Sequence, residues 1–438
     1  MSDAEGRNEL EVELYNLSIG SLQGRGNDPV LAWSEELEAT GWELFSPVLS
    51  NSLPLGKVTD PNAGSNFFGG LLPEGRWLGK LANEIGTGDR DIVGLFSKVG
   101  GDLAGALRVG VSDHEASDPE ELTSDDVRTM LEGAGGFMIG GGGSALAGYQ
   151  RKIALSRIDG RWYAGRGSTP STHILKPVLQ GDEPQAYGED YTLALARHMG
   201  LSSFETRVED VGGITTLVIE RYDRVRVGST IKRLHQEDAA QALSLPWYDD
   251  SKFEEQNSRS NLKAVAGLLD EGRTIFSKGE SDVDRLLRYT TFNVAVGNTD
   301  AHAKNFSIIR PKGSRAYLAP LYDAAPIALR YEGRRTLAMK VAGHSYQPTM
   351  TTDHLIEEAG NWGISDSNAR RIVLDTLEKL IDGTRTVAAH PSIAALTPGY
   401  IRGQAQNLAE GKPAEIAGAT PPALRKFIGT PSPRASDV

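Results

Sequence analysis

Hydrophobic and polar positions divide the chain into a strand-rich first half and a helix-rich second half. Alternating or continuous apolar runs predict strands, the main ones over residues 10–17, 153–155, 156–166, 172–177 and 215–219. Apolar residues at helical spacing predict helices over residues 76–85, 91–99, 189–199, 283–296, 353–359 and 366–380. Helices dominate after Arg233, and no internal repeat is visible.

The composition is that of an ordinary globular protein. With 438 residues, 39% of them hydrophobic, the chain can bury a sizeable core in two or three structural units. It has no cysteine, which excludes disulfides, cysteine-ligated zinc and thiol catalysis. The first residues do not resemble a signal peptide and no run of 18 apolar residues occurs, so we expect a cytoplasmic protein without a membrane partner. A net charge of −12 argues against broad electrostatic binding to nucleic acid.

Two segments are typical of a linker and a tail. Residues 112–126 are acidic and poor in large apolar side chains, which predicts a linker or a surface excursion. From Gly418 onward the chain is rich in proline and small residues, which predicts a disordered tail.

The candidate chemistry centres on residues 297–309, Gly-Asn-Thr-Asp-Ala-His-Ala-Lys-Asn-Phe-Ser-Ile-Ile. Asp300 and Asn305 stand five residues apart, the interval at which a protein-kinase catalytic loop carries its base and its metal-binding amide. An aspartate in this place accepts or orients the proton of an attacking hydroxyl, while the asparagine oxygen helps to hold magnesium. Taken alone, this spacing is a weak signal.

Asp323 is the candidate for a second metal ligand, since magnesium usually takes one or two carboxylates beside the phosphates of its substrate. It follows an apolar run over residues 306–309 and a turn at residues 311–313, which together predict a β-hairpin. The metal-binding aspartate of a kinase stands in the same place. An aspartate before Ala-Ala-Pro is by itself more often a turn or cap residue, but the order of these segments favours the metal-binding role.

A glycine run at residues 140–143 precedes the strand predicted over residues 153–155. It is either a flexible linker or a loop whose backbone N–H groups approach phosphates closely, and it is not a Walker motif. Lys176 ends the next apolar strand, where a kinase places the lysine that holds the α- and β-phosphates, although a lone lysine there is usually solvated. A helix from Glu189 and the strand over residues 215–219 follow, where a kinase has its αC helix and its adenine hinge.

Together these segments resemble the HipA-type serine/threonine kinases, the toxin halves of bacterial toxin–antitoxin pairs. The shared motifs are Phe-Phe-Gly-Gly-Leu-Leu-Pro-Glu-Gly (67–75), Gly-Asp-Leu-Ala-Gly-Ala-Leu (101–107), Ala-Gly-Tyr-Gln-Arg-Lys (147–152), Thr-His-Ile-Leu-Lys (172–176), Glu-Arg-Tyr-Asp-Arg (220–224), Leu-His-Gln-Glu-Asp (234–238), Gly-Asn-Thr-Asp-Ala-His-Ala-Lys-Asn-Phe-Ser (297–307) and Leu-Tyr-Asp (321–323). They stand in the family's order and span nearly the whole chain.

The resemblance implies an α+β protein with a two-lobed protein-kinase-like fold, an N-terminal β-rich subdomain and a mostly helical C-terminal lobe. The domains we expect are the N-terminal subdomain (1–110), the acidic linker (111–127), the N-lobe with the glycine-rich loop and the ATP lysine (128–228), the helical C-lobe with the catalytic loop (229–417) and the tail (418–438).

The resemblance also implies an activity and partners. ATP and Mg²⁺ would be the cosubstrates of a serine/threonine protein kinase that acts as a toxin, phosphorylates itself and, as in characterised members, phosphorylates an aminoacyl-tRNA synthetase. The implied partner is a small helix-turn-helix antitoxin, HipB-like, that binds the kinase and operator DNA together.

Carried over residue by residue, the resemblance gives each matching side chain a role. Asp300 would be the base, and His302 would either face the nucleotide or support the catalytic loop as a scaffold. Asn305 and Asp323 would bind magnesium. The residues that would hold the nucleotide, together with His302, are Gly148, Gln150, Lys152, Lys176, Glu220 and Tyr222.

One departure from the family concerns self-regulation. The family loop usually carries a serine three residues before the glycine of Gly-x-Gln-x-Lys, but here that place is Ala145 and the serine is Ser144. In the family, phosphorylation of the loop serine switches the kinase off, because a phosphoserine adds about −1.5 to −2 charges beside the ATP phosphates. We therefore expect either autophosphorylation at Ser144 or no autoinhibition by this loop.

Two other functions stay open at this point. A small-molecule phosphotransferase would share the two aspartates and the asparagine, but the N-terminal subdomain and the Leu-Pro-Glu-Gly motif count against it. A catalytically weak regulator would act only through its antitoxin and DNA, but it has no physical need for Lys176, Asp300, Asn305 and Asp323. A short helix-turn-helix reading frame beside this one would favour the toxin pair.

Overall fold

The computed structural model describes residues 9–24, 26–56, 60–110, 119–139, 143–164, 170–228, 230–269, 280–330 and 334–415. The chain forms two units. The first consists of Met1–Val178, Arg207–Ser251 and Ser307–Ala316, and the second of Leu179–Thr206, Lys252–Phe306 and Tyr317–Val438. The predicted tail (418–438), residues 111–118 of the predicted linker and glycines 140–142 lie outside the described residues.

The N-terminal part of the first unit is a four-stranded antiparallel sheet packed against helices. The strands β1 (Glu9–Leu14), β2 (Leu17–Gln23), β3 (Val30–Trp33) and β4 (Leu107–Val109) lie in the order β3-β2-β1-β4. Where the sequence predicts one strand over residues 10–17, the chain turns at Tyr15 and Asn16, whose φ angles of 54° and 60° suit the tight connection of a β-hairpin.

The helices of this part fill its core with aromatic side chains. They are η1 (Leu37–Thr40), α1 (Ala63–Gly69), α2 (Arg76–Ile85) and α3 (Ile92–Val99). Phe68 is fully buried and meets the rings of Phe67 and Phe96 edge to face, at centroid distances of 5.2 and 6.2 Å. Such aromatic pairs add about 0.5–1.5 kcal/mol each beyond the burial of their area.

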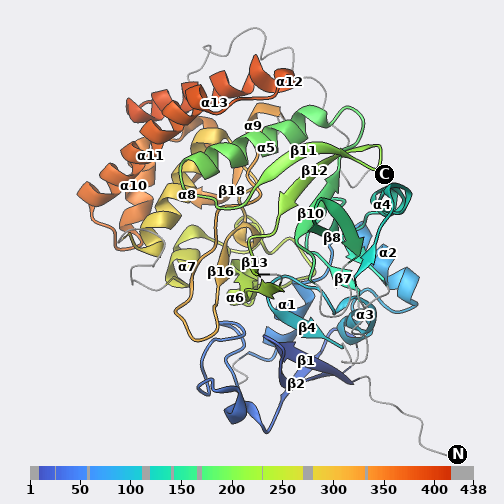
Figure 1. The fold of residues 1–438 in the computed structure, drawn as a ribbon. Helices are drawn as coiled ribbons and strands as arrows, with labels where there is room; N and C mark the ends of the chain where they lie inside the picture. Colours follow the sequence, from blue (N-terminus) through green and yellow to red (C-terminus); the bar gives the residue numbers. More distant parts are fainter. Residues whose placement is uncertain are drawn as a thin grey trace, which may run out of the picture. The chain divides into compact units, whose positions relative to one another are not determined.

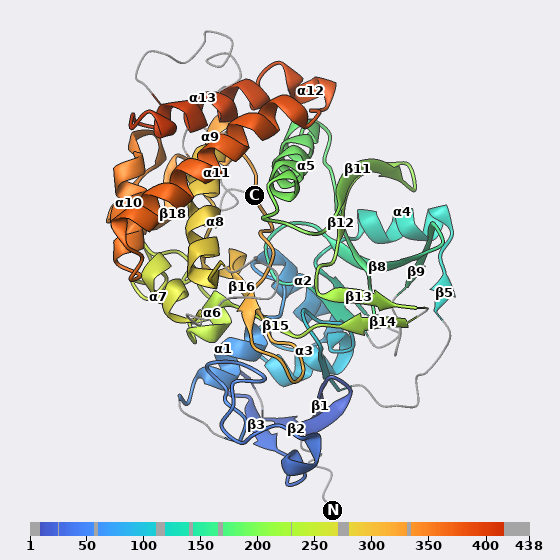
Figure 2. The ribbon, with the colours of Figure 1, turned by 60° about the vertical axis from the view of Figure 1, so that its left-hand side comes forward.

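A six-stranded sheet forms a second core in the first unit (Figure 2). Its strands, in spatial order, are β11 (Thr206–Val211), β12 (Ile214–Glu220), β10 (His173–Pro177), β8 (Ile153–Ile158), β9 (Arg161–Ala164) and β5 (Glu120–Glu121). Helix α4 (Ser124–Glu132) begins at a capping box formed by Thr123 and Asp126 and packs Val127 and Leu131 against the sheet. The smaller elements are β6 (Phe137–Met138), β7 (Ser144–Ala145), β13 (Arg224–Val227), β14 (Thr230–Arg233), β15 (Gln236–Asp238), α6 (Ala239–Ala242) and β16 (Ser307–Ile309).

The second unit is mostly helical (Figure 1). Its helices are α5 (Glu183–His198), α7 (Leu262–Gly267), α8 (Asp282–Val296), η3 (Ala303–Asn305), α9 (Ile327–Arg330), η4 (Gln347–Thr349), α10 (Thr352–Gly360), α11 (Asp366–Thr386), α12 (Pro391–Ala394) and α13 (Thr397–Ala409). Its strands are β17 (Tyr317–Leu318), β18 (Thr336–Val341) and β19 (His344–Tyr346). Helix α11 packs against α8, α10 and α13.

Helix α8 confirms the helix predicted over residues 283–296. Its start is fixed by a capping box, in which Ser281 and Asp284 satisfy each other's backbone N–H groups. It ends at Gly297, whose φ of 75° lies in the left-handed region that favours glycine. The chain therefore leaves the core at a defined residue, directly before the predicted catalytic loop.

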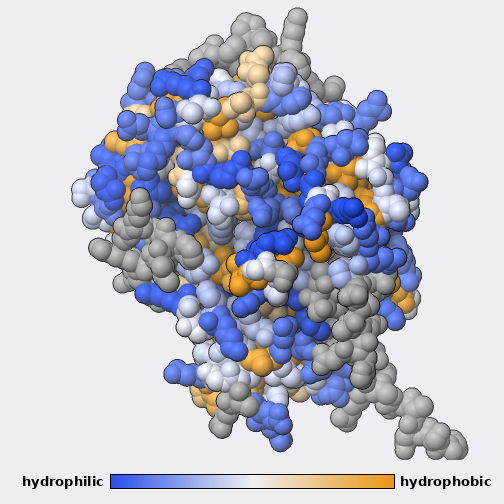
Figure 3. All heavy atoms as spheres, in the orientation of Figure 1, coloured by the Kyte–Doolittle hydropathy of each residue, from blue (hydrophilic) through white to orange (hydrophobic). Residues whose placement is uncertain are grey.

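On the face drawn in Figure 3, hydrophobic residues lie in separate groups among hydrophilic ones. Among the residues that the structure describes, no helix is both long and apolar enough to cross a bilayer.

Candidate functional site

The backbone around Asp300 is held from several sides. The side chain of Asn298 donates from Nδ2 to Asn293 Oδ1 at 3.0 Å and accepts from the backbone N–H of Asp300 at 3.4 Å. Thr299 donates from Oγ1 to the carbonyl of Arg334 at 2.7 Å, and its own carbonyl accepts from Ala338 N–H at 2.9 Å. Asp300 itself is exposed. A solvent-exposed carboxylate whose backbone is held in place can accept a hydrogen bond from a substrate hydroxyl.

The turn after Asp300 brings His302 and Asn305 together. The carbonyl of Asp300 accepts from His302 N–H at 2.8 Å, and the carbonyl of His302 accepts from Asn305 N–H at 2.9 Å. His302 is only 8% exposed and meets the ring of Phe253 edge to face, at a centroid distance of 5.1 Å. This surrounding favours a supporting role for His302 beside the catalytic loop.

Residues 252–260 support the same turn. The sequence predicts an exposed acidic loop over residues 247–259, but Lys252 is only 6% exposed. The carbonyl of Lys252 accepts from Ala303 N–H at 3.2 Å and from Ser260 Oγ at 2.5 Å. The prediction of an exposed loop is therefore wrong for the part that packs against the turn after Asp300. There Lys252 is buried, because its carbonyl accepts hydrogen bonds from Ala303 and Ser260, although the neighbouring residues are polar.

Asn305 and Asp323 are in direct contact. Asn305 donates from Nδ2 to Asp323 Oδ2 at 2.9 Å. Asn305 Oδ1 is buried and has no hydrogen-bond partner among the described residues. Asp323 is exposed, with a left-handed φ of 53°. The chain between the two forms β16 and β17, the two strands that the sequence predicts there.

An amide oxygen without a partner beside a carboxylate fits Mg²⁺, which prefers oxygen ligands. In the described ranges no group of three or more His, Cys, Asp or Glu side chains could hold a metal alone. This agrees with the usual state of Mg²⁺ in phosphate chemistry, where one or two carboxylates share the ion with substrate phosphates and water. The chemistry of Asn305 and Asp323 therefore fits the predicted metal site.

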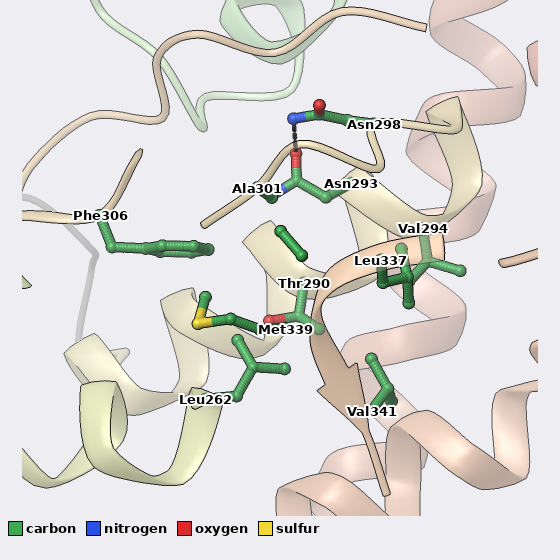
Figure 4. Close-up of a pocket in the computed structure, with 11 residues that line it drawn as sticks. Leu262, Thr290, Asn293, Val294, Asn298, Ala301, Phe306, Leu337, Met339 and Val341 are labelled. Atoms are coloured by element: carbon green, nitrogen blue, oxygen red, sulfur yellow. Dashed lines mark hydrogen bonds between the residues drawn. The ribbon is translucent and has the colours of Figure 1, made fainter. Parts of the chain in front are cut away.

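A narrow pocket lies beside the catalytic loop within the second unit (Figure 4). Its lining is mostly apolar and comes from the loop, α7, α8 and β18, namely Leu262, Thr290, Asn293, Val294, Asn298, Ala301, Phe306, Leu337, Ala338, Met339 and Val341. It has room for about one or two water molecules. It is too small for a substrate, and Asn298 and Asn293 form a hydrogen bond with each other at its edge.

The predicted nucleotide-binding residues lie in the first unit. Lys176 is half-buried in β10, where it pairs with Leu217 of β12. Glu220, at the end of β12, is exposed and pairs with His173. Tyr222 donates its hydroxyl to Gln236 Oε1, and burial raises the pKa of Tyr222.

An ionic cluster (Asp102, Arg221, Asp223, Arg224) was missed by sequence reasoning. Three of its members, Arg221, Asp223 and Arg224, lie directly beside Glu220 and Tyr222 in the sequence, and Asp102 joins them from a distant segment. Arg221 donates from Nε and Nη2 to the two carboxylate oxygens of Asp223 at 3.0 and 2.8 Å. Arg224 donates to Asp102 Oδ1 at 2.9 Å. Burial raises the pKa of Asp223, but the two arginines outweigh it and hold this pKa well below its usual range. The signal in the sequence is the Arg-Tyr-Asp-Arg run directly after a buried strand.

The structure describes the glycine-rich segment from Gly143 onward. Ser144 is only 6% exposed in β7, which pairs with β6. Gly148 has a φ of 110°, and Lys152 donates from Nζ back to the carbonyl of Ala147. Gln150 is exposed. The roles of these residues toward a nucleotide stay predictions.

Two family models match the chain. The model described as HipA N-terminal domain matches residues 10–110, and the model described as HipA-like C-terminal domain matches residues 144–383. The chain is 31% identical over 389 residues to the protein Y4mE of Sinorhizobium fredii, which covers 84% of this chain and 87% of that protein. It is 26% identical over 354 residues to the serine/threonine-protein kinase toxin HipA of Shewanella oneidensis, which covers 76% of this chain and 78% of that one.

A solved structure shares the fold. It is the Shewanella oneidensis MR-1 complex of HipA, HipB and operator DNA, one chain of which matches with a TM-score of 0.76 and 19% sequence identity. The match covers 97% of this chain and 100% of that chain. The predicted fold class, α+β and protein-kinase-like with an N-terminal β-rich subdomain, is confirmed.

Proposed function

Because this chain belongs to the family of HipA-type serine/threonine kinase toxins, we propose that it transfers the γ-phosphate of ATP to a serine or threonine hydroxyl of a protein, with Mg²⁺ as cofactor. One observation supports this best. Asn305 contacts Asp323 and keeps a buried amide oxygen without a described partner, on the same short stretch as the exposed Asp300. Protein kinases hold Mg²⁺ with an asparagine of the catalytic loop and a second aspartate, and an aspartate of the same loop accepts the proton of the substrate hydroxyl.

In the proposed reaction, the oxygen of the acceptor hydroxyl forms a bond to the γ-phosphorus. The bond from this phosphorus to the β,γ-bridging oxygen breaks, and ADP leaves. Asp300 accepts the hydroxyl proton, and its exposed position lets a protein side chain reach it. Asn305 and Asp323 would hold Mg²⁺, which neutralises the phosphate charges when bound.

The first unit would supply the nucleotide contacts. We assign Lys176 to the α- and β-phosphates, and Glu220 and Tyr222 to the adenine. The ionic cluster supports this assignment, because it fixes the backbone of residues 221–224 beside the proposed adenine contacts. Gly148, Gln150 and Lys152 would approach the phosphates from the loop.

We also propose that the protein acts as the toxin of a toxin–antitoxin pair. The matching Shewanella oneidensis chain was solved with HipB and operator DNA, which supports a HipB-like helix-turn-helix antitoxin as partner. Operator DNA would be reached through the antitoxin, in agreement with the net charge of −12 of this chain. An aminoacyl-tRNA synthetase as the substrate rests on the family resemblance.

The test is quantitative phosphoproteomics after induction of the wild type, of Asp300→Asn and of Asp382→Asn. Asp382 is an exposed aspartate on α11 and serves as the matched control. We expect new phosphoserine or phosphothreonine sites with the wild type and the control, and a loss of about 10²–10⁴-fold in transfer rate with Asp300→Asn. Equal phosphorylation by all three would remove Asp300 from the reaction. ATP turnover without any phosphoprotein would favour a small-molecule phosphotransferase.

A further inference from the structure

The turn over residues 73–77, which follows α1 and includes the first two residues of α2, contacts the second half of the glycine-rich segment. Glu74 N–H donates to the carbonyl of Gly148 at 3.2 Å, and Pro73 forms a parallel β-bridge with Gly148. Trp77 donates from Nε1 to the carbonyl of Tyr149 at 2.8 Å. The sequence alone gives this Pro-Glu-Gly turn no role beyond the start of a helix.

The shape of the turn depends on Gly75. Its φ of 57° lies in the left-handed region, and a Cβ atom there would stand 2.6 Å from Cε1 of Tyr149. The ring of Tyr149 therefore lies directly over Gly75, and its hydroxyl donates to Asp250 Oδ1 at 3.3 Å. Only glycine provides both this backbone conformation and this close approach.

Other segments of the first unit hold the same loop. Arg151 donates from Nη2 to the carbonyl of Leu131 at 3.1 Å and to the carbonyl of Glu132. Gly136 N–H donates to the carbonyl of Lys152 at 2.9 Å. The main-chain contacts leave Gln150 exposed between residues that are held on both sides. The loop is thus supported by three separate parts of the first unit.

We propose that the turn over residues 73–77 is a positioning element for the nucleotide, and that Gly75 and Trp77 are its positioning residues. The turn fixes the backbone of residues 148–152 in the conformation that receives the phosphates of ATP. This inference rests on the proposed function, because it assumes that this loop meets the nucleotide. It gives the N-terminal subdomain a direct part in nucleotide affinity.

Trp77→Phe tests the proposal with little change in packing, since it keeps an aromatic ring and removes the N–H donor. Loss of one hydrogen bond should raise the Kd for Mg-ATP about 3- to 10-fold, with little change in turnover at saturating ATP. Amide hydrogen exchange in residues 149–152 should become faster without nucleotide. The matched control is Trp33→Phe, because Trp33 Nε1 is buried without a hydrogen-bond partner among the described residues.

Gly75→Ala gives a second test. Its control is Gly86→Ala, because Gly86 also has a positive φ, of 81°, but has open space around a Cβ atom, so it reports the cost of an alanine at positive φ without a steric clash. We expect Gly75→Ala to weaken Mg-ATP binding more than Gly86→Ala does. Equal effects of the two substitutions would contradict a close fit between Gly75 and Tyr149.

The outcomes separate this inference from the proposed function. Unchanged loop exchange in Trp77→Phe would overturn the positioning role, and faster exchange with an unchanged Kd would overturn the link to the nucleotide. A wild-type protein that binds no Mg-ATP would overturn the proposed function and the nucleotide part of this inference. The exchange rates would still decide whether the turn holds the loop.

Discussion

Asp323→Asn separates the proposed metal-binding role of this side chain from its part in the fold. Asp323 has a φ of 53°, a left-handed conformation that asparagine also tolerates. The new amide keeps the size of the side chain and an oxygen that can accept from Asn305 Nδ2, now at 2.9 Å from the carboxylate. We therefore expect the free energy of unfolding to change by less than about 1 kcal/mol.

Loss of the negative charge should instead weaken the binding of Mg²⁺. Substitution of a residue that only hydrogen-bonds to a metal ligand already lowers metal affinity about 10- to 100-fold. Loss of one of the few carboxylates near Mg²⁺ should cost at least as much, so the Kd for Mg-ATP should rise about 10- to 100-fold, or about 1.4–2.7 kcal/mol. Asn305 Oδ1 stays in place, so binding is weakened and not abolished.

Calorimetric titration of Mg-ATP at several Mg²⁺ concentrations measures this effect. Excess Mg²⁺ should partly restore ATP binding to Asp323→Asn, since the defect lies in the metal. Asp323→Ala is the comparison, because alanine in a left-handed conformation adds about 1–2 kcal/mol of strain and should lower stability as well. An unchanged Kd in a folded Asp323→Asn protein would refute the metal-binding role.

Three further predictions concern other residues. Burial lowers the pKa of His235 from 6.5 to about 4, so the unfolded state takes up a proton before the folded state does as the pH falls. Denaturant unfolding should therefore show a loss of about 2–3 kcal/mol in the free energy of unfolding between pH 6.5 and pH 4. This loss should be smaller in His235→Gln. Phe253→Leu removes the ring beside His302 and should lower turnover about 3- to 10-fold at unchanged Kd for Mg-ATP. Intact-mass and phosphopeptide analysis decides between autophosphorylation at Ser144, which is 6% exposed in β7, and the absence of autoinhibition by this loop. Phosphate on Ser144 should be accompanied by faster amide hydrogen exchange in β7, and phosphate that persists in Asp300→Asn expressed alone would contradict self-phosphorylation.

The sequence predicts helix α8 and the proximity of Asn305 and Asp323 because the signals for both are local. A capping box, helical spacing and a glycine define α8 from neighbouring residues alone. The contact between Asn305 and Asp323 spans only 18 positions and follows from a predicted hairpin. Side chains that neighbouring segments bring together can therefore be predicted from the order of the residues, while their role in catalysis stays a prediction.

The supports of the site are not predictable in this way, because they join distant segments. Lys252 meets Ala303 from another part of the second unit, and polar neighbours in the sequence hide its burial. The contact of Trp77 with Tyr149 spans 72 positions. Neither contact leaves a periodic pattern, since each depends on one backbone carbonyl that meets one donor.

The ionic cluster joins the N-terminal subdomain to the part of the first unit that contains the six-stranded sheet. Asp102 lies in the part matched by the HipA N-terminal model, and Arg224 lies in the part matched by the HipA-like C-terminal model. They pair at 2.9 Å with both side chains buried, while Asp223 accepts from Gly105 N–H at 2.8 Å and binds Arg221. Removal of one partner from a buried ion pair costs about 3–5 kcal/mol, because the remaining charge stays buried. The two matched parts are thus joined by the buried pair of Asp102 and Arg224, in which each part supplies the charge that the other needs. The proposed adenine contacts, Glu220 and Tyr222, stand beside Arg221, Asp223 and Arg224 in the chain.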